Sequence, residues 1–385
     1  MINYDDRDWL ILTFFRVRGS VAGKACWFAV PSALLSLGLL IMDDEDPNIR
    51  LDSSLNDLSS GTAWSALTVC LFIMVNFRTS RAMGRFWEGT GLMHQMRGEW
   101  FDTVSNCVTF STSARITKPE EVMRFRHTLV RMMSLAHGHA LEEIAGYQFV
   151  ARTIDPNGLE PSISQFLKSM HEDCNFNKVE VDLHLIQSLI TRANAEGLLQ
   201  VPPPIVSRVF QTISRGFVNL LNTKKITDTK FPYPHVQLLI FLMLSFSCFT
   251  PIFLTNVITN KFVAMAVTFL PNFAVASLYQ IAVELENPFG ADANDLPLEH
   301  FQSEMDNCLL MLLHPDADIV PTVTPTCGFD FYSLMNEFQP AIYRNGDYCK
   351  NNLNQAEMTR QAAAQDPPDS DPPALFSPII PQEVS

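Results

Sequence analysis

Residues 61–100 read GTAWSALTVCLFIMVNFRTSRAMGRFWEGTGLMHQMRGEW, and this stretch decides the fold. The segment from Trp64 to Phe77 is almost wholly apolar. The part after it keeps helical spacing but carries the charged residues Arg78, Arg81, Arg85, Glu88 and Arg97. No proline interrupts the stretch. The sequence therefore predicts one long helix that begins in a bilayer and leaves it at Phe77–Arg78.

On the apolar half, Val69, Ile73 and Phe77 follow one another at i, i+4 and i+8 and so share one face of the helix. If that face points at a symmetry axis, several copies of the chain form three hydrophobic rings, which is a pore neck. The alternative is an ordinary helix–helix core, and the spacing alone favours that alternative.

The composition excludes several classes of protein. The 385 residues are 47% apolar, with 28 phenylalanines, which is heavy for a soluble chain. A formal net charge of −14 argues against a nucleic-acid partner. The eight cysteines are scattered and form no CxxC pair, so we expect free thiols without a bound metal. The pair His137 and His139 has no suitable third ligand nearby in the sequence, which favours packed or solvated side chains over a metal site.

Four apolar segments are suited to crossing a membrane, at 25–42, 62–77, 236–257 and 262–283. The first follows Arg16, Arg18 and Lys24 and precedes an acidic loop at 43–60, which places the N-terminus on the cytoplasmic side. Four spans then leave both termini cytoplasmic. None of the four segments holds a His, Asp, Lys or Arg before its cytoplasmic end, and no catalytic motif is found, so we do not expect an enzyme.

The remaining residues complete an all-α membrane protein. Helical spacing between residues 86 and 230 predicts a helical cytoplasmic domain, and a further helix is expected at 298–313. The predicted regions are a cytoplasmic N-terminal segment (1–24), two membrane helices with the neck (25–85), the helical cytoplasmic domain (86–230), two more membrane helices (231–285), a cytoplasmic C-terminal segment (286–350) and a disordered proline-rich tail (351–385).

Two motifs resemble those of the bestrophin family of anion channels. They are FRTSRAMGRFWEG after the second span and ENPFGADANDLPL after the fourth. The segments RGS (18–20), VPPPIVSRVF and KFPYPHVQ fit the same family, and the resemblance covers residues 4–315. It departs at Ser80–Met83, where the family often has Asn-Ser/Ala-Tyr, and at Asn76, where animal members have glycine.

The resemblance implies a homopentamer in the lipid bilayer around one central pore that carries monovalent anions such as chloride, nitrate or bicarbonate. It places the three neck positions on Val69, Ile73 and Phe77, and a second, cytoplasmic constriction near residues 205–226. A non-conducting scaffold or assembly factor of the same fold is the alternative function. The plasma membrane and the thylakoid membrane are both compatible with the resemblance.

Charge near the neck is expected from Arg78, Arg81 and Arg85 at its cytoplasmic end. Asn76 either lines the pore or donates a hydrogen bond to a neighbouring helix, and the sequence leaves both open.

The resemblance also implies a calcium clasp. Carried over from animal members, it would use the backbone carbonyls of Glu284 and Asn287 and the carboxylates of Asp292 and Asp295, which are hard oxygen donors. The alternative is a tight Asn-Pro-Phe-Gly turn followed by Asp295 as the N-cap of the next helix. This alternative is slightly favoured, because Asn294 and Leu296 interrupt the run of acidic residues that animal members have here.

Overall fold

The computed structural model describes residues 15–45, 62–146, 149–332 and 334. Most of the predicted N-terminal segment, most of the acidic loop and the whole predicted tail lie outside these residues. The chain divides into two compact units, Met1–Asp318 and Ile319–Ser385. The first unit contains the long helices α2 (Ala22–Glu45), α4 (Thr62–Phe110), α5 (Pro119–Ala145), α6 (Pro161–Glu172), α7 (Lys178–Ala195), α8 (Pro203–Asp228), α9 (Tyr233–Val257), α10 (Lys261–Glu286) and α11 (Leu298–Met311). Two short 3-10 helices, η2 (Ser113–Ile116) and η4 (Pro156–Gly158), join them, and no strand occurs among the described residues.

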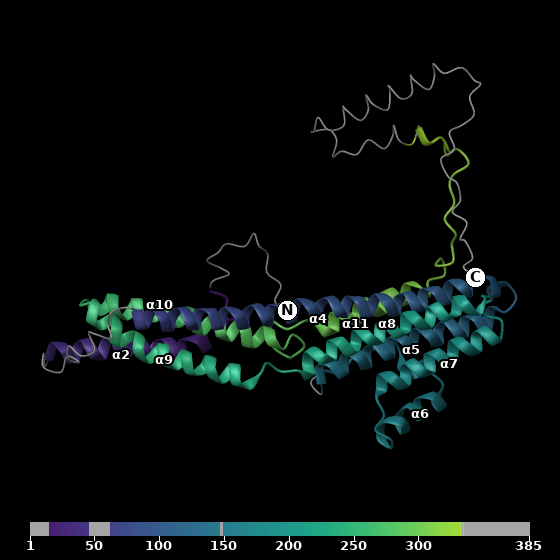
Figure 1. Ribbon diagram of the computed structural model, residues 1–385. Helices are drawn as coiled ribbons and strands as arrows, with labels where there is room; N and C mark the ends of the chain where they lie inside the picture. Colours follow the sequence, from purple (N-terminus) through teal and green to yellow (C-terminus); the bar gives the residue numbers. More distant parts are fainter. Residues whose placement is uncertain (1–14, 46–61, 147–148, 333, 335–385) are drawn as a thin grey trace, which may run out of the picture. The chain divides into compact units, whose positions relative to one another are not determined.

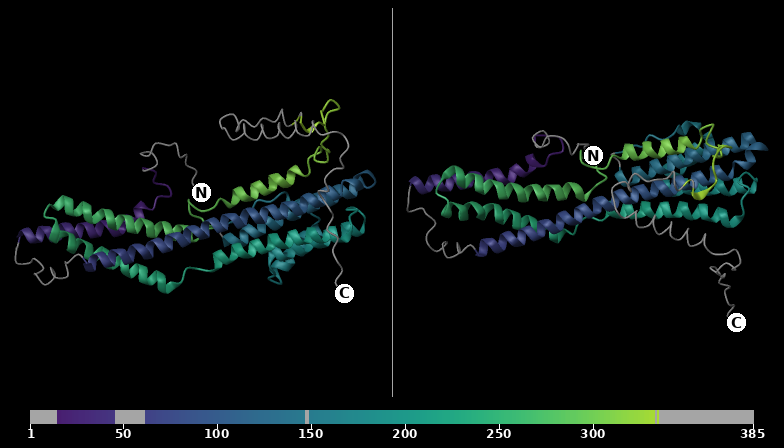
Figure 2. Two further views of the ribbon diagram at one scale, coloured as in Figure 1. Left: turned by 45° about the horizontal axis from the view of Figure 1, so that its top comes forward. Right: turned by 90° about the horizontal axis from the view of Figure 1, so that it is seen from above.

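The predicted long helix is confirmed, because α4 runs unbroken for 49 residues (Figure 1). At about 1.5 Å per residue such a helix is about 70 Å long, more than twice the thickness of a hydrocarbon core. Its N-terminal half packs with α9 and α10, and its C-terminal half packs with α5, α8 and α11. The single helix α4 therefore belongs to two helix bundles (Figure 2).

The first bundle combines α2, α9, α10 and the N-terminal half of α4. Its core joins Leu71 and Val75 of α4 to Met243 and Phe246 of α9 and to Ala276 of α10. Three of these helices are long and apolar enough to cross a membrane, namely α2, α9 and α10. The N-terminal half of α4 packs among them, but among the described helices it does not meet that criterion of length and hydropathy.

Small side chains allow α2 to approach α10 closely. Ala25, Ala29 and Ala33 repeat every four residues on α2 and are almost completely buried. Ser32 on the same helix donates a hydrogen bond of 2.7 Å to the carbonyl of Ser247 and accepts one of 3.1 Å from Asn272. These bonds tie α2 to α9 and α10 where water cannot replace a lost partner.

The second bundle is centred on Trp100, which is fully buried on α4. The indole Nε1 donates to the carbonyl of Ile213 on α8 at 3.3 Å. The ring lies so close to α8 that a Cβ atom placed at Gly216 would be 2.3 Å from Nε1. Glycine at position 216 therefore makes the close approach of α4 and α8 possible.

Two contacts connect the bundles where α10 ends. The guanidinium of Arg78 pairs with the carboxylate of Glu286 at 2.9 Å, and Phe289 packs against Gly89, whose added Cβ would lie 2.9 Å from the ring. Both contacts join the last turn of α10, and the turn after it, to the stretch of α4 between the bundles. The end of α10 is thereby fixed to the middle of α4.

We expect Gly216→Ala to lower the stability of the protein, because the new methyl group overlaps the Trp100 ring and overpacking a core costs about 1–3 kcal/mol. Gly91→Ala is the matched control, since an added Cβ at this helical glycine meets nothing within 4 Å. The thermal unfolding midpoint of the purified protein in detergent measures the difference. Equal midpoints for the two variants would contradict the tight α4–α8 contact.

Candidate functional site

The candidate site is the face of α4 formed by Val69, Ile73 and Phe77, which we call the neck face. These side chains are 57%, 54% and 43% exposed, respectively. On the opposite side of the helix, Leu71 and Val75 are each only 1% exposed. Packing within the chain therefore covers one side of the apolar half of α4 and leaves the neck face free.

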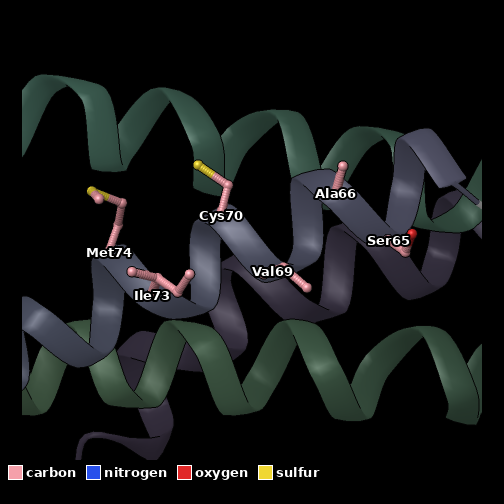
Figure 3. Close-up of a pocket in the computed structure, with 6 residues that line it drawn as sticks. All are labelled: Ser65, Ala66, Val69, Cys70, Ile73 and Met74. Carbon is pink, nitrogen blue, oxygen red and sulfur yellow. The ribbon is translucent and has the colours of Figure 1, made fainter.

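Val69 and Ile73 lie one turn apart along an apolar groove on α4 (Figure 3). The groove is completed by Ser65, Ala66, Cys70 and Met74. Cys70 is exposed there, although cysteine is usually a buried residue. An apolar groove of this kind is suited to contact with lipid, with another chain or with a dewetted pore.

Phe77 differs from the other two residues because aromatic rings of α9 and the segment before it support it. Its ring centroid lies 5.6 Å from that of His235 and 6.5 Å from that of Phe231. The guanidinium carbon of Arg81 lies 5.2 Å from the Phe77 ring centroid, within the range of a cation–π contact. Phe77 is therefore the neck residue whose position depends on groups outside its own helix.

The structure separates the three predicted arginines. Arg78 lies nine residues after Val69, about two and a half helical turns, so it points to the buried side of α4. There its side chain is 5% exposed, pairs with Glu286 and packs 4.8 Å from the ring of Tyr279. Arg78 thus holds the bundle together and does not lie on the neck face.

Arg85 also has a structural role. It donates one hydrogen bond to the carbonyl of Thr229 at 2.8 Å and another to the carbonyl of Ile226. These are carbonyls at the C-terminal end of α8, which have no partner within the helix and favour a positive charge. Of the three arginines, only Arg81 is exposed and next to the neck face.

Asn76 is exposed beside Phe77 and makes no hydrogen bond with the described part of the chain. Of the two roles that the sequence leaves open for it, the structure gives no bond to a neighbouring helix of its own chain. Its amide can therefore face whatever occupies the space in front of the neck face.

The side chains of the implied calcium clasp make other contacts in this chain. The Glu284 carboxylate is 3.1 Å from the ammonium of Lys24 and accepts a hydrogen bond of 3.0 Å from Asn294. Asp295 is buried, and its Oδ2 accepts from the backbone N–H of Asp292 at 2.7 Å. No group of three or more His, Cys, Asp or Glu side chains suited to a metal occurs among the described residues.

The alternative for this segment is also only partly right. A turn follows α10, but the N-cap of α11 is Pro297 and no side chain caps that helix. Asp295 instead closes the turn before that helix, because its side chain accepts a hydrogen bond from the backbone N–H of Asp292, three residues earlier in the chain. Burial raises the pKa of Asp295 from 3.8 to about 6, helped by the neighbouring charges of Asp292 and Glu284 and opposed by the backbone hydrogen bond.

His137 and His139 lie in different surroundings. Nδ1 of His137 is 2.8 Å from Oε1 of Gln302, and burial lowers the pKa of this histidine to about 4. Nδ1 of His139 is instead 2.6 Å from the carboxylate of Asp182. Each histidine therefore connects α5 to a different helix of the second bundle.

Sequence reasoning missed the groups that support the site. These are Phe231 and His235 next to Phe77, Glu286 opposite Arg78, and Phe289 on Gly89. The motifs containing them are visible in the sequence, but the motifs give no pairing between residues about 150 to 210 positions apart.

The fold and site define an integral membrane protein, and the described part of the chain is entirely helical. One long helix joins a membrane bundle to a second helical bundle. Residues 1–310 match the family model described as Bacterial/Fungal Bestrophin protein. The chain belongs to the bestrophin family.

Relatives and solved structures agree with this family. A voltage-dependent anion channel-forming protein of Synechocystis sp. is 25% identical over 262 residues, which cover 62% of this chain and 73% of that protein. A crystal structure of a bacterial bestrophin homologue from Klebsiella pneumoniae shares the fold with a TM-score of 0.59 at 19% identity, covering 75% of this chain and 98% of that one. A second structure of that homologue gives a TM-score of 0.58 and covers 99% of its chain.

We expect Glu286→Gln to destabilise the protein by about 3–5 kcal/mol, because it leaves the buried guanidinium of Arg78 without its counter-charge. Glu304→Gln is the control, since Glu304 pairs with Arg97 but is 33% exposed, and such pairs contribute about 1 kcal/mol or less. Thermal unfolding in detergent compares them. A loss no greater than that of the control would show that the Arg78–Glu286 pair does not hold the bundles together.

We expect Asp295→Asn to stabilise the protein at pH 8 and to stabilise it about half as much at pH 5, where the folded carboxyl is mostly protonated but the unfolded one is ionised. A carboxyl with a raised pKa favours folding below its unfolded pKa of 3.8, and this contribution is lost as the pH rises through about 6. The shift corresponds to at most about 3 kcal/mol at pH 8. Unfolding midpoints at both pH values measure it, with Asp173→Asn, a change at an exposed aspartate that does not contribute to the shift, as the control. An equal gain at both pH values would contradict the raised pKa.

Proposed function

We propose that the protein is an anion-selective channel in which the neck faces of five chains line one central pore. The family and the name of the Synechocystis relative, a voltage-dependent anion channel-forming protein, support an anion channel. The observation that carries the proposal is the exposure of Val69, Ile73 and Phe77 on a helix whose other side is buried. A symmetry axis in front of this face turns three exposed apolar rungs into three stacked rings.

In this proposal four segments cross the membrane, namely α2, the N-terminal half of α4, α9 and α10. The N-terminal half of α4 packs within the same core as α9 and α10, which supports its crossing with them. The basic residues before α2 favour a cytoplasmic N-terminus. The second bundle then lies in the cytoplasm or the stroma, together with the C-terminal segment.

The exposed stripe of α4 continues below the neck in the same register and becomes mostly polar or small, with one large side chain, Trp87, which is 67% exposed. Its exposed residues are Ser80, Gly84, Trp87, Gly91, His94, Gln95, Gly98 and Asp102. Beside it, Glu99 pairs with Arg215 of α8 at 2.9 Å. We propose that this stripe forms the wall of a wide, wet chamber below the narrow apolar neck.

The apolar rings have no charge with which to select an anion. We assign them the role of a barrier that loses its water when the channel is closed. Anion preference then comes from the surroundings, namely Arg81 at the lower end of the neck, the positive edges of the aromatic rings and the amide of Asn76. The second candidate function, a non-conducting scaffold of the same fold, predicts no ion flux.

We expect Ile73→Ala with Phe77→Ala to widen and wet the neck, so that anion current rises while the preference for anions over cations largely remains. Arg81→Gln should instead lower that preference and leave the neck closed as in the wild type. Flux from liposomes containing purified protein, and reversal potentials under a salt gradient, measure both effects.

Three results would contradict the proposal. No flux from the wild-type protein favours the scaffold. A monomer or dimer by mass in mild detergent removes the symmetry axis. Unchanged flux in the double variant means that the neck face does not line a pore.

A further inference from the structure

The apolar groove on α4 has the form of a series of holes between side chains. Its lining side chains stand in two rows with a spacing of four residues, Ser65, Val69 and Ile73 in one row and Ala66, Cys70 and Met74 in the other (Figure 3). In packed helices, a hole bounded by four such residues receives one side chain of the facing helix. Small side chains such as Ala66 and Cys70 let that helix approach closely inside a bilayer, where packing drives helix association. The groove is therefore suited to a further helix.

Phe72 is a large side chain on the other flank of the neck face. It is 59% exposed and lies outside the core of the membrane bundle. Along the helix axis it lies midway between Cys70 and Met74, at the height of the hole that these two residues form with the opposite row. Around the axis, at about 100° per residue, it lies about a third of a turn from that hole. One face of α4 thus carries a large side chain and, level with it, a hole.

A large side chain and a hole at one height are suited to a closed ring of identical chains. A two-fold dimer brings the same patch of both chains together, whereas each chain of a ring uses two different patches. Rotation about an axis along the membrane normal leaves the depth of every residue unchanged, so Phe72 of one chain lies at the height of the groove of the next. In a ring of five helices the directions to the two neighbours differ by about 108°, which is similar to that third of a turn.

The two flanks of α4 also border helices of opposite charge in the second bundle. Glu99 comes 29 residues after Cys70, about eight turns, and pairs with Arg215 of α8. Arg97 comes 25 residues after Phe72, about seven turns, and pairs with a carboxylate of α11. The groove flank therefore borders α8, which has four basic residues and one acidic residue, and the Phe72 flank borders α11, which has three acidic residues and no lysine or arginine. A contact between the two flanks joins a basic helix to an acidic one.

We infer that Phe72 of each chain inserts into the α4 groove of the next chain, which makes a second copy of this chain the partner of the groove. Val69 and Ile73 form one wall of the groove, so the inserted ring holds both side chains toward the axis. The contact therefore sets the direction of the neck face as well as joining neighbouring chains. This inference rests on the proposed channel function, because it needs the ring of five chains.

The first test uses the native Cys70, which is exposed in the groove, as a reporter. In Phe72→Cys the new thiol should lie against Cys70 of the neighbouring chain, and a disulfide needs Cβ atoms within about 3.5–4.5 Å of each other. Residues two apart on one helix do not face each other, so such a disulfide joins different chains. After oxidation in the membrane we expect a ladder of up to five linked chains on a denaturing gel without reductant, because each chain carries one large side chain and one groove.

Two variants control for chance collisions between thiols. Phe72→Cys with Cys70→Ser lacks the second thiol and should give no ladder. Phe241→Cys places a thiol at an exposed position of α9 at a similar depth, and it should give no ladder either. No ladder from Phe72→Cys, an equal ladder from Phe241→Cys, or a ladder that ends at two chains would overturn the inference.

A second test exchanges the large and the small side chain. Cys70→Phe fills the groove and Phe72→Ala removes the side chain that enters it, so each should lower the temperature at which the oligomer dissociates in mild detergent. The double variant places the large side chain on the other side of the same contact and should recover most of the loss. A double variant that dissociates no later than the weaker single variant would overturn the inference.

These outcomes can be told apart from those of the proposed function. No anion flux from the wild type, together with a ladder of up to five chains in Phe72→Cys, contradicts the channel and leaves the contact. Anion flux from a wild-type pentamer whose Phe72→Cys variant forms no ladder overturns the contact and leaves the channel. A wild-type monomer by mass overturns both.

Discussion

The ion pair between Arg78 and Glu286 is the contact on which the rest of the structure depends. It is buried at the point where α4 passes from one bundle to the other, and Phe289 packs on Gly89 three turns further along α4. Together the two contacts fix the rotation of α4 about its own axis relative to α10. That rotation decides which residues of α4 are buried and which form the neck face.

The sequence predicted the elements that depend on local pattern. The unbroken α4 follows from a long stretch without proline. The spacing of Val69, Ile73 and Phe77 put them on one face of the helix but favoured a core, whereas the resemblance made that face a neck, and in the chain it is exposed. The same spacing already put Arg78 on the opposite side of the helix, about two and a half turns after Val69. Grouping the arginines by their closeness to Phe77 in the sequence missed this, because neighbours along a helix point in different directions.

What the sequence could not predict depends on contacts between distant segments. Glu286 neutralises Arg78 across more than 200 residues, and Lys24 pairs with the carboxylate of Glu284, the residue whose backbone carbonyl the resemblance placed next to a metal. The contact that the carboxylate of Asp295 makes within its own turn also depends on which way the side chain points. Only the fold shows that it points back to the Asp292 N–H. The partners of charged residues could therefore be found only from the three-dimensional arrangement, whereas the sequence alone showed which residues share a face of a helix.

The Arg78–Glu286 ion pair and the ring of Phe77 are also linked by a chain of contacts. Glu286 accepts hydrogen bonds from Arg78 on α4 and from the backbone of Phe231 just before α9, and the Phe231 ring lies against both His235 and Phe77. A displacement of the end of α10 would therefore reach Phe77 through the ring of Phe231. In the proposed channel, where three apolar rings would act in series, moving the lowest ring alone would be enough to change whether water fills the neck.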